Sequence, residues 1–311
     1  MPTVQTRRRS DGAEDHTRSQ ATRRKTRASA ICLLVLLAGL PALQAAPPAL
    51  AGSGRSGCKA CLGSMTKDGT PWWAPTDNFK RGGMPFRKGK LLQVVMLGAR
   101  GDGTADRMIW PMVKALSQFG TWTRLVSAAP FCPNNMCEAP TFDLGHARFH
   151  SHYIAFVYRS IATRDSTSLV GTLTARQKRF FDKYVRAPGY SSDSGYVVWA
   201  TEGGGGPDGS DRLPGISIGP YLSLGTKLLV PGYFETIVKT AGPPGVTASG
   251  LPFATVQQAL VQADRTHYAS LVHAVNAEAN LFTAVICKAD GSQPRKACDR
   301  GVVRGIAKHL R

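Results

Sequence analysis

Apolar residues follow two different spacings in succession between residues 91 and 119. Residues 91–97 are almost all apolar and end at Gly98, which predicts a short buried strand. In residues 105–119 the apolar side chains recur three and four positions apart, which predicts one buried face of a helix. A glycine-rich turn, residues 98–104, joins the two. The pattern therefore predicts a strand, a tight turn and a helix, around which we expect the rest of the domain to be organised.

Further strands and helices are predicted along the remainder of the chain. A helix over residues 173–187 begins with Thr174 as its N-cap and stops at Pro188, and a later helix stops at Gly291. This mixture of strands and helices predicts the α/β class. The remaining predicted helices cover residues 256–261 and 268–288, and the strands cover 123–129, 142–144, 153–158, 196–200 and 216–218, with 142–144 and 153–158 forming a hairpin.

The N-terminal region has the composition of a signal peptide. Residues 1–29 are polar and basic, and residues 30–43 are apolar but shorter than the roughly 20 residues that a membrane span requires. Small residues at 49 and 51 predict cleavage after Ala51. Residues 1–51 are thus expected to direct the chain to a secreted or extracytoplasmic location, and an uncleaved membrane anchor is the alternative. Residues 52–90 are rich in Gly, Pro and Ser and predict an extended linker, which leaves 91–311 as the domain.

Seven cysteines occur, and Cys32 lies in the predicted signal peptide. The even number that remains is typical of an exported protein with disulfide bonds. Cys58 and Cys61 flank two residues, as in a redox dithiol, but no strand is predicted before them, so a structural disulfide is favoured over a dithiol or zinc ligands. A small disulfide-closed loop is predicted at Cys132 and Cys137. The disulfide candidates are Cys58, Cys61, Cys132, Cys137, Cys287 and Cys298.

The formal net charge is +19, which favours anionic partners. Lipid headgroups, acidic polymers and non-specific nucleic acid all fit, and a solvated basic surface is the alternative. No recognition motif accompanies the charge, so no specific nucleic acid is expected. Between residues 72 and 90, Trp72, Trp73, Phe79 and Phe86 alternate with Lys and Arg, which predicts either peripheral contact with a membrane or polymer, or a loop whose tryptophans pack back on the domain.

The turn at residues 98–104 is the first candidate site. It directs backbone N–H groups and the positive end of the predicted helix towards one point, which suits an anion or a thiolate. Asp102 and Thr104 are both good N-cap residues, and no cysteine is present there. The turn therefore offers a carboxylate, which cannot exchange disulfides.

Histidines provide the second candidate site. His146, Arg148, His150 and His152 alternate, so an extended chain would place them on one face, close to Asp143. Such a set can supply nitrogen ligands to zinc or copper, whereas a solvent-facing polar strand is the other interpretation. No Gly-x-Ser-x-Gly motif supports a hydrolase, and no cofactor is expected.

A series of short motifs, in order, resembles a thioredoxin-like family, domain of unknown function 929. The resemblance covers roughly residues 90–303. It starts at the predicted strand, turn and helix and continues through the segments 117–121, 140–142, 153–157, 173–174, 216–219, 279–287 and 293–294. The resemblance implies a mixed sheet flanked by helices, with insertions and a C-terminal helical segment.

The resemblance also assigns site residues. The family carries a Cys-x-x-Cys pair in the turn, and these positions fall on Asp102 and Ala105, while Gly98, Ala99 and Trp110 fit its pattern. Thioredoxin-like folds have a cis-proline before a strand opposite the turn, and the matching residue is Pro214. Cys287 and Cys298 match a terminal cysteine pair of the family, which implies a disulfide.

These inferences together favour a binding or structural module over an enzyme. We expect an exported thioredoxin-like protein, redox-inactive at the usual site, that binds an extended peptide or an anionic cell-envelope component in a groove between Asp102, Thr104 and Pro214. One alternative is an extracytoplasmic thiol–disulfide oxidoreductase with a displaced pair, Cys58 with Cys61 or Cys132 with Cys137. Another is a metal-binding module that uses His146, His150 and His152.

Overall fold

A computed structural model describes residues 79–100, 103–128, 140–163, 172–185, 213–224, 253–262 and 268–310, together with Leu62, Met65 and Lys67. All of them belong to the unit Pro48–Arg311. The predicted signal peptide, the strand over 196–200, Asp102 and the cysteines Cys58, Cys61, Cys132 and Cys137 lie outside the described residues.

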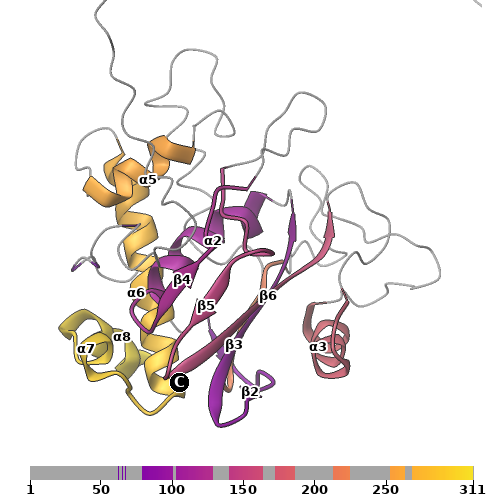
Figure 1. Ribbon diagram of the computed structural model, residues 1–311. Helices are drawn as coiled ribbons and strands as arrows, with labels where there is room; N and C mark the ends of the chain where they lie inside the picture. The colour runs from indigo at the N-terminus through magenta and orange to yellow at the C-terminus, as the bar shows by residue number, and fades with distance from the viewer. Residues whose placement is uncertain are drawn as a thin grey trace, which may run out of the picture. The chain divides into compact units, whose positions relative to one another are not determined.

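The centre of the domain is strand β3, Leu91–Arg100, which extends the strand predicted over residues 91–97. One side of β3 pairs in parallel with β6, Ile154–Thr163, and the other pairs antiparallel with β7, Gly215–Ile218 (Figure 1). Residues 94–97 of this central strand are fully buried, because helices cover both faces of the sheet. The sheet continues from β7 to β8, Tyr221–Leu224, and then to β1, Lys80–Arg81, while β2, Phe86–Lys88, pairs with the first residues of β3.

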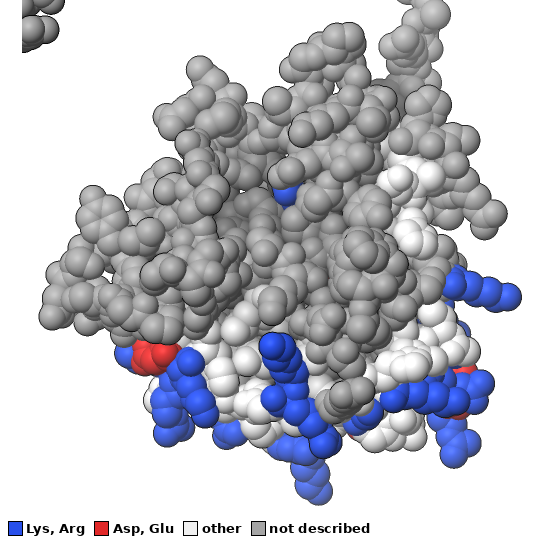
Figure 2. Space-filling view, turned by 180° about the vertical axis from the view of Figure 1, so that it is seen from behind, with Lys and Arg blue, Asp and Glu red and all other residues white. Residues whose placement is uncertain are grey.

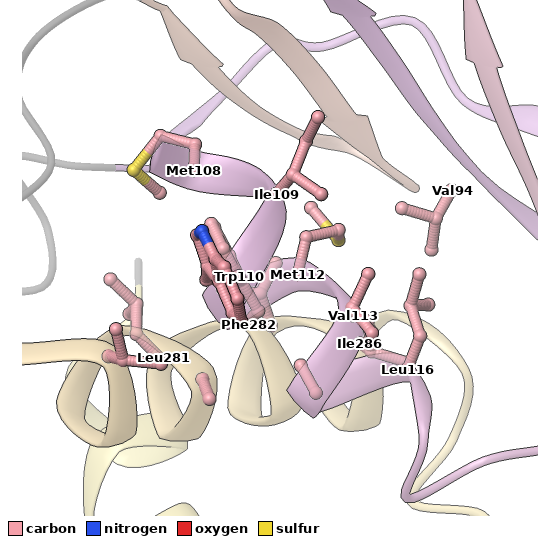
Figure 3. Close-up of a cluster of buried hydrophobic side chains, with 14 of the residues drawn as sticks. Val94, Met108, Ile109, Trp110, Met112, Val113, Leu116, Leu281, Phe282 and Ile286 are labelled. Carbon is pink, nitrogen blue, oxygen red and sulfur yellow. The ribbon is translucent and has the colours of Figure 1, made fainter. Parts of the chain in front are cut away.

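Helices α2, Gly103–Leu116, and α6, Ala269–Ala289, cover one face of the sheet. Alternate β3 residues, among them Val94 and Met96, point into this layer because successive strand side chains point to opposite faces. Figure 3 shows α2 lying across α6, with Trp110 over Phe282 and with Leu116 beside Ile286. Helices α5, Phe253–Gln262, α7, Arg295–Cys298, and α8, Gly301–His309, complete this layer.

The opposite face of the sheet is covered by α3, Ala175–Phe180, and the π-helical turn η2, Phe181–Val185. Val95 and Leu97 point into this smaller core, where the Phe86 and Phe180 rings meet edge to face. Thr174 caps α3 as predicted: its hydroxyl accepts a hydrogen bond from the Gln177 N–H. The domain is therefore an α/β fold, a mixed sheet with helices on both faces, as the sequence predicts.

The end of α6 is closed by a turn and a disulfide. Gly291 has φ +72°, and the Ser292 N–H donates to the Cys287 carbonyl, so the predicted stop is confirmed. Cys287 is bonded to Cys298 with a Cα–Cα distance of 5.6 Å, which confirms the expected disulfide. By length and composition α6 would be able to cross a membrane, but 89% of its apolar window is buried inside the fold.

Three sequence predictions about strands are wrong. Residues 142–144 and 153–158 do not form a hairpin, because β6 pairs in parallel with β3 and Phe142 forms only an isolated bridge with Ser127. The strand predicted over 123–129 is instead the short β4, Thr121–Thr123, which ends where Arg124 has a positive φ of 56°, and it pairs with β5, Arg148–His150. In the predicted linker, β1 and β2 join the sheet, so the folded region begins before Leu91.

Candidate functional site

The candidate groove lies at the end of β3 that leads into α2. The last residue pair between β7 and β3 is Gly215 with Leu97, so Pro214 occupies the register position opposite Gly98. The Leu213–Pro214 peptide bond is cis, as expected, and Pro214 is buried. Thr104 lies in the first turn of α2. The described residues therefore place Thr104 and Pro214 at the same end of the central strand, whereas Asp102 is not among them.

Close packing restricts the size of residues at this end of the sheet. A Cβ added to Gly98 would lie 3.1 Å from the Tyr158 ring and 3.3 Å from the Ala105 Cβ. A Cβ added to Gly215 would lie 2.5 Å from the Val185 Cγ2. Glycine at position 215 therefore allows β7 to approach η2 closely, whereas a side chain at position 98 would require the Tyr158 ring and Ala105 to shift by a few tenths of an ångström.

The first turns of α2 are held by the segment before β5. The Thr141 hydroxyl donates to the Asp106 carbonyl at 2.8 Å, and the Trp110 Nε1–H donates to the Pro140 carbonyl at 2.8 Å. Asp106 is only 4% exposed and lies in the first turn, where the helix dipole favours a negative charge. Sequence reasoning did not identify Asp106 as part of the site, although an acid in the first turn of a helix is a recognisable signal.

Ala105, where the sequence resemblance would place the second cysteine, is fully buried in α2. An alanine has no sulfur to exchange, so this position contributes only its methyl group to the packing against Gly98. Among the described residues, the sulfur atoms of Cys287 and Cys298 are buried and bonded to each other, far along the chain from this turn.

The predicted histidine site does not assemble. The His146 Nδ1 lies 2.6 Å from the Asp143 Oδ2, in a turn where the Gly145 N–H also donates to Asp143. His150 in β5 instead contacts the Thr123 hydroxyl across the strand pair, at 3.2 Å. Only residues 148–150 are extended, so His146, His150 and His152 do not share a strand face. Within the described ranges, no group of three or more His, Cys, Asp or Glu side chains is arranged to hold a metal ion.

The Asp143 carboxyl titrates below its usual range. Burial on its own raises the pKa of Asp143, but the hydrogen bonds from His146 and Gly145, with the electrostatic attraction of His146, outweigh burial and lower the pKa. Because the His146 side chain is 83% exposed, this pair is a surface interaction rather than a buried catalytic dyad.

A buried charge that the sequence analysis overlooked lies in the helical layer. Lys114 of α2 is 1% exposed, and its Nζ donates to the Leu62 carbonyl at 2.7 Å. Glu278 of α6, fully buried, is a second ionisable group in the same layer. Buried charged groups require hydrogen-bond partners, and the hydrogen bond from Lys114 links Leu62 to α2. This role is structural.

Comparison of the chain with protein-family models, with curated proteins and with solved structures finds no match to any of them. The function of the site therefore has to be inferred from its own residues.

Proposed function

We propose that this chain is an exported thioredoxin-like protein that is redox-inactive at the usual site and binds an extended peptide beside Pro214. The order of elements supports the fold assignment: β3, α2 and the parallel strand β6, then α3, then the antiparallel strands β7 and β8, then α6. Helices α2 and α6 share one face and α3 covers the other. A proline immediately before β7 fits the same arrangement.

The proposed loss of redox activity rests on the residues that take the two cysteine positions. Disulfide exchange requires a thiolate that attacks a sulfur and a second thiol that resolves the mixed disulfide. Ala105 is buried at the second position and Asp102 takes the first, so neither step has a sulfur. A carboxylate before the first turn of α2 is instead stabilised by the helix dipole.

The observation that carries the binding function is the end of the ladder between β3 and β7. The paired residues end with Gly215 and Leu97. The residue immediately before Gly215 is Pro214, which has no N–H to donate. A strand-like ligand that adds to the sheet at this point gains main-chain hydrogen bonds without the side-chain chemistry of a thiol. The bound segment would run past the N-terminus of α2, where Asp102 and Thr104 come next in the chain.

Peptide binding is tested with the reduced and carboxymethylated B chain of insulin, an extended peptide whose thiols are blocked. Hydrogen–deuterium exchange of the full protein should slow around residues 97–105 and 213–216 when the peptide is added. Asp102→Ala should weaken binding, whereas Asp299→Ala, an exposed acid next to α7, should leave it unchanged. Protection elsewhere, or equal loss in both variants, would contradict the proposed groove.

Insulin reduction provides the redox test. The wild-type protein should not accelerate the precipitation of reduced insulin, and the double variant Asp102→Cys/Ala105→Cys should gain that activity, because a thiolate at a helix N-terminus has a lowered pKa. Turnover by the wild type that disappears in Cys58→Ser or Cys132→Ser would show instead that a displaced dithiol is active.

A further inference from the structure

We propose that the end of the sheet opposite the candidate groove is a cationic face that docks on an anionic phospholipid surface. This cationic face consists of the exposed side chains of Lys80, Arg81, Arg87, Lys88 and Lys90. Figure 2 shows Lys and Arg side chains projecting along the lower margin of the described surface, with only two small groups of acidic atoms among them. The same margin contains β2 in Figure 1.

The strand register places these cations at one end of the sheet. β2 pairs with Leu91–Gln93, the first residues of β3, and β1 pairs with Tyr221 and Leu222 directly after the turn between β7 and β8. The candidate groove begins after Leu97, at the other end of this ten-residue strand. At about 3.3 Å per residue, the seven steps from Leu91 to Gly98 give a separation of roughly 23 Å. A molecule docked by its cationic face would therefore hold the groove away from the surface.

The phenylalanines of this segment do not take part in the cationic face. Phe79 is 1% exposed and packs edge to face on Phe282, while Phe86 is 3% exposed and packs on Phe180. The sequence interpretation in which these two rings contact a membrane is therefore wrong, since they anchor the segment in the two cores. Between residues 79 and 90, what remains outside is a set of charges without an apolar wedge, so docking would be electrostatic and sensitive to salt.

Within the described ranges, one acid interacts electrostatically with this face. Asp290 lies close enough to Arg87 to interact with it electrostatically, and burial raises the pKa of this carboxyl against that attraction. Two ion pairs of described residues, His146 with Asp143 and Lys178 with Asp182, use no residue of the cationic face. Lys80, Lys88 and Lys90 are thus exposed and available to an external anion.

Two observations favour a lipid surface over a nucleic acid or another polymer. The aromatic side chains within residues 79–90, Phe79 and Phe86, are both buried, so this stretch has no platform on which bases could stack. In addition, the apolar segment 30–43 precedes the cationic face in the sequence. Among the described strands, β1 is the first that follows this apolar segment in the chain.

The experiment compares two triple variants of the full chain that lose the same charge. Lys80→Gln/Lys88→Gln/Lys90→Gln removes cations of the face, and Arg295→Gln/Lys296→Gln/Arg304→Gln removes cations of α7 and α8. Co-sedimentation is measured with vesicles of phosphatidylcholine alone and with vesicles containing one third phosphatidylserine. The ratio of the two partition coefficients isolates the electrostatic part, because segment 30–43 is identical in every protein.

We expect a wild-type ratio well above one that falls with added salt. With a contribution of roughly fivefold per cation near an anionic bilayer, the first variant should lower the ratio about 100-fold, and the second should change it less than fivefold. Equal losses in both variants would show a non-specific effect of net charge and overturn the proposal. Tighter binding of the wild type to soluble heparin than to the anionic vesicles would also overturn it, in favour of a polymer partner.

Discussion

The disulfide between Cys287 and Cys298 gives the sharpest prediction about stability. It joins the last turn of α6 to α7 across a sequence separation of 11. In the loop-closure estimate, a cross-link over so short a loop stabilises the fold by about 2 to 3 kcal/mol, because it restricts the unfolded chain. Replacement of both cysteines with alanine should lower the melting temperature by roughly 5–10 °C for a domain of this size.

The helices beyond the disulfide should remain attached when it is removed. Val303, Ile306 and Leu310 are buried in the main core, and the Lys288 ammonium donates to the Ala307 carbonyl at 3.0 Å and to the Leu310 carbonyl. We therefore expect one cooperative urea transition, followed by circular dichroism, with a lower midpoint and an m value that is equal or slightly larger, because the unfolded chain without the cross-link exposes more surface.

The single variants Cys287→Ala and Cys298→Ala test the reasoning. Either substitution breaks the cross-link, so each should cost nearly as much as the double variant. If the double variant instead costs the sum of the two singles, the loss comes from the packing of two buried side chains and not from the cross-link. A loss below about 1 kcal/mol in the double variant would contradict the loop-closure estimate itself.

Two further predictions concern β4, β5 and the turn before them. Gly120→Ala should destabilise the domain by about 1–3 kcal/mol in thermal unfolding, because the new Cβ would lie 2.2 Å from the His150 carbonyl oxygen. As a control, Gly305→Ala in α8, where nothing lies within 4 Å, should stabilise the domain by up to about 1 kcal/mol. A neutral Gly120→Ala would contradict the close approach of the two segments. Asp143→Asn should lower stability at pH 7 by less than about 1 kcal/mol, since the pair is largely exposed. The folded-state pKa of Asp143 is lowered, so the contribution of its carboxylate to stability is present above the unfolded pKa of about 3.9 and disappears as the pH falls through the folded pKa. Urea titrations should therefore give the variant and the wild type equal stabilities at pH 2. A difference that persists at that pH would contradict this assignment.

The local signals in the sequence were sufficient for the long elements. β3, α2 and α6 have sustained apolar periodicity, and the stop at Gly291 follows from local backbone chemistry. The cap at Thr174 is likewise a local signal, since Gln177 completes the capping box three residues later. Elements of this kind are specified within one window of the chain, so they can be identified from the order of residues alone.

Pairings between distant segments could not be predicted in this way. β1 and β2 have only two and three residues, and they are strands because β8 and β3 pair with them. The apolar pattern of β6 is the same whether it pairs with β3 in parallel or with a neighbour in a hairpin. Lys114 would be expected at the surface because lysine is charged, yet a hydrogen bond to the Leu62 carbonyl, 52 residues earlier in the chain, makes its burial possible. Each of these depends on a contact that no local window contains.

The candidate site was predictable only in part, for a related reason. Pro214 was placed by resemblance, and the structure puts it beside the end of β3 through the pairing of Gly215 with Leu97. The histidine site failed because Asp143 binds His146 in a turn and only residues 148–150 become a strand. Alternating residues share a face only where the chain is extended, and the sequence did not establish that.

The layout of the core explains how a fold of this kind can persist without the chemistry expected at its turn. The large core is formed by β3 residues up to Met96, by α2 from Met108 and by α6, all of which lie before or after the turn at residues 98–104. The Ala105 methyl group fills the space beside Gly98 and would lie 3.3 Å from a Cβ added to Gly98. A cysteine at position 105 is therefore not needed for packing. Substitutions at turn residues after Gly98 thus change what the site can do while leaving the core contacts in place. The proposed thioredoxin-like fold would therefore not by itself give this chain a thiol activity, since such an activity depends on atoms that contribute little to the core.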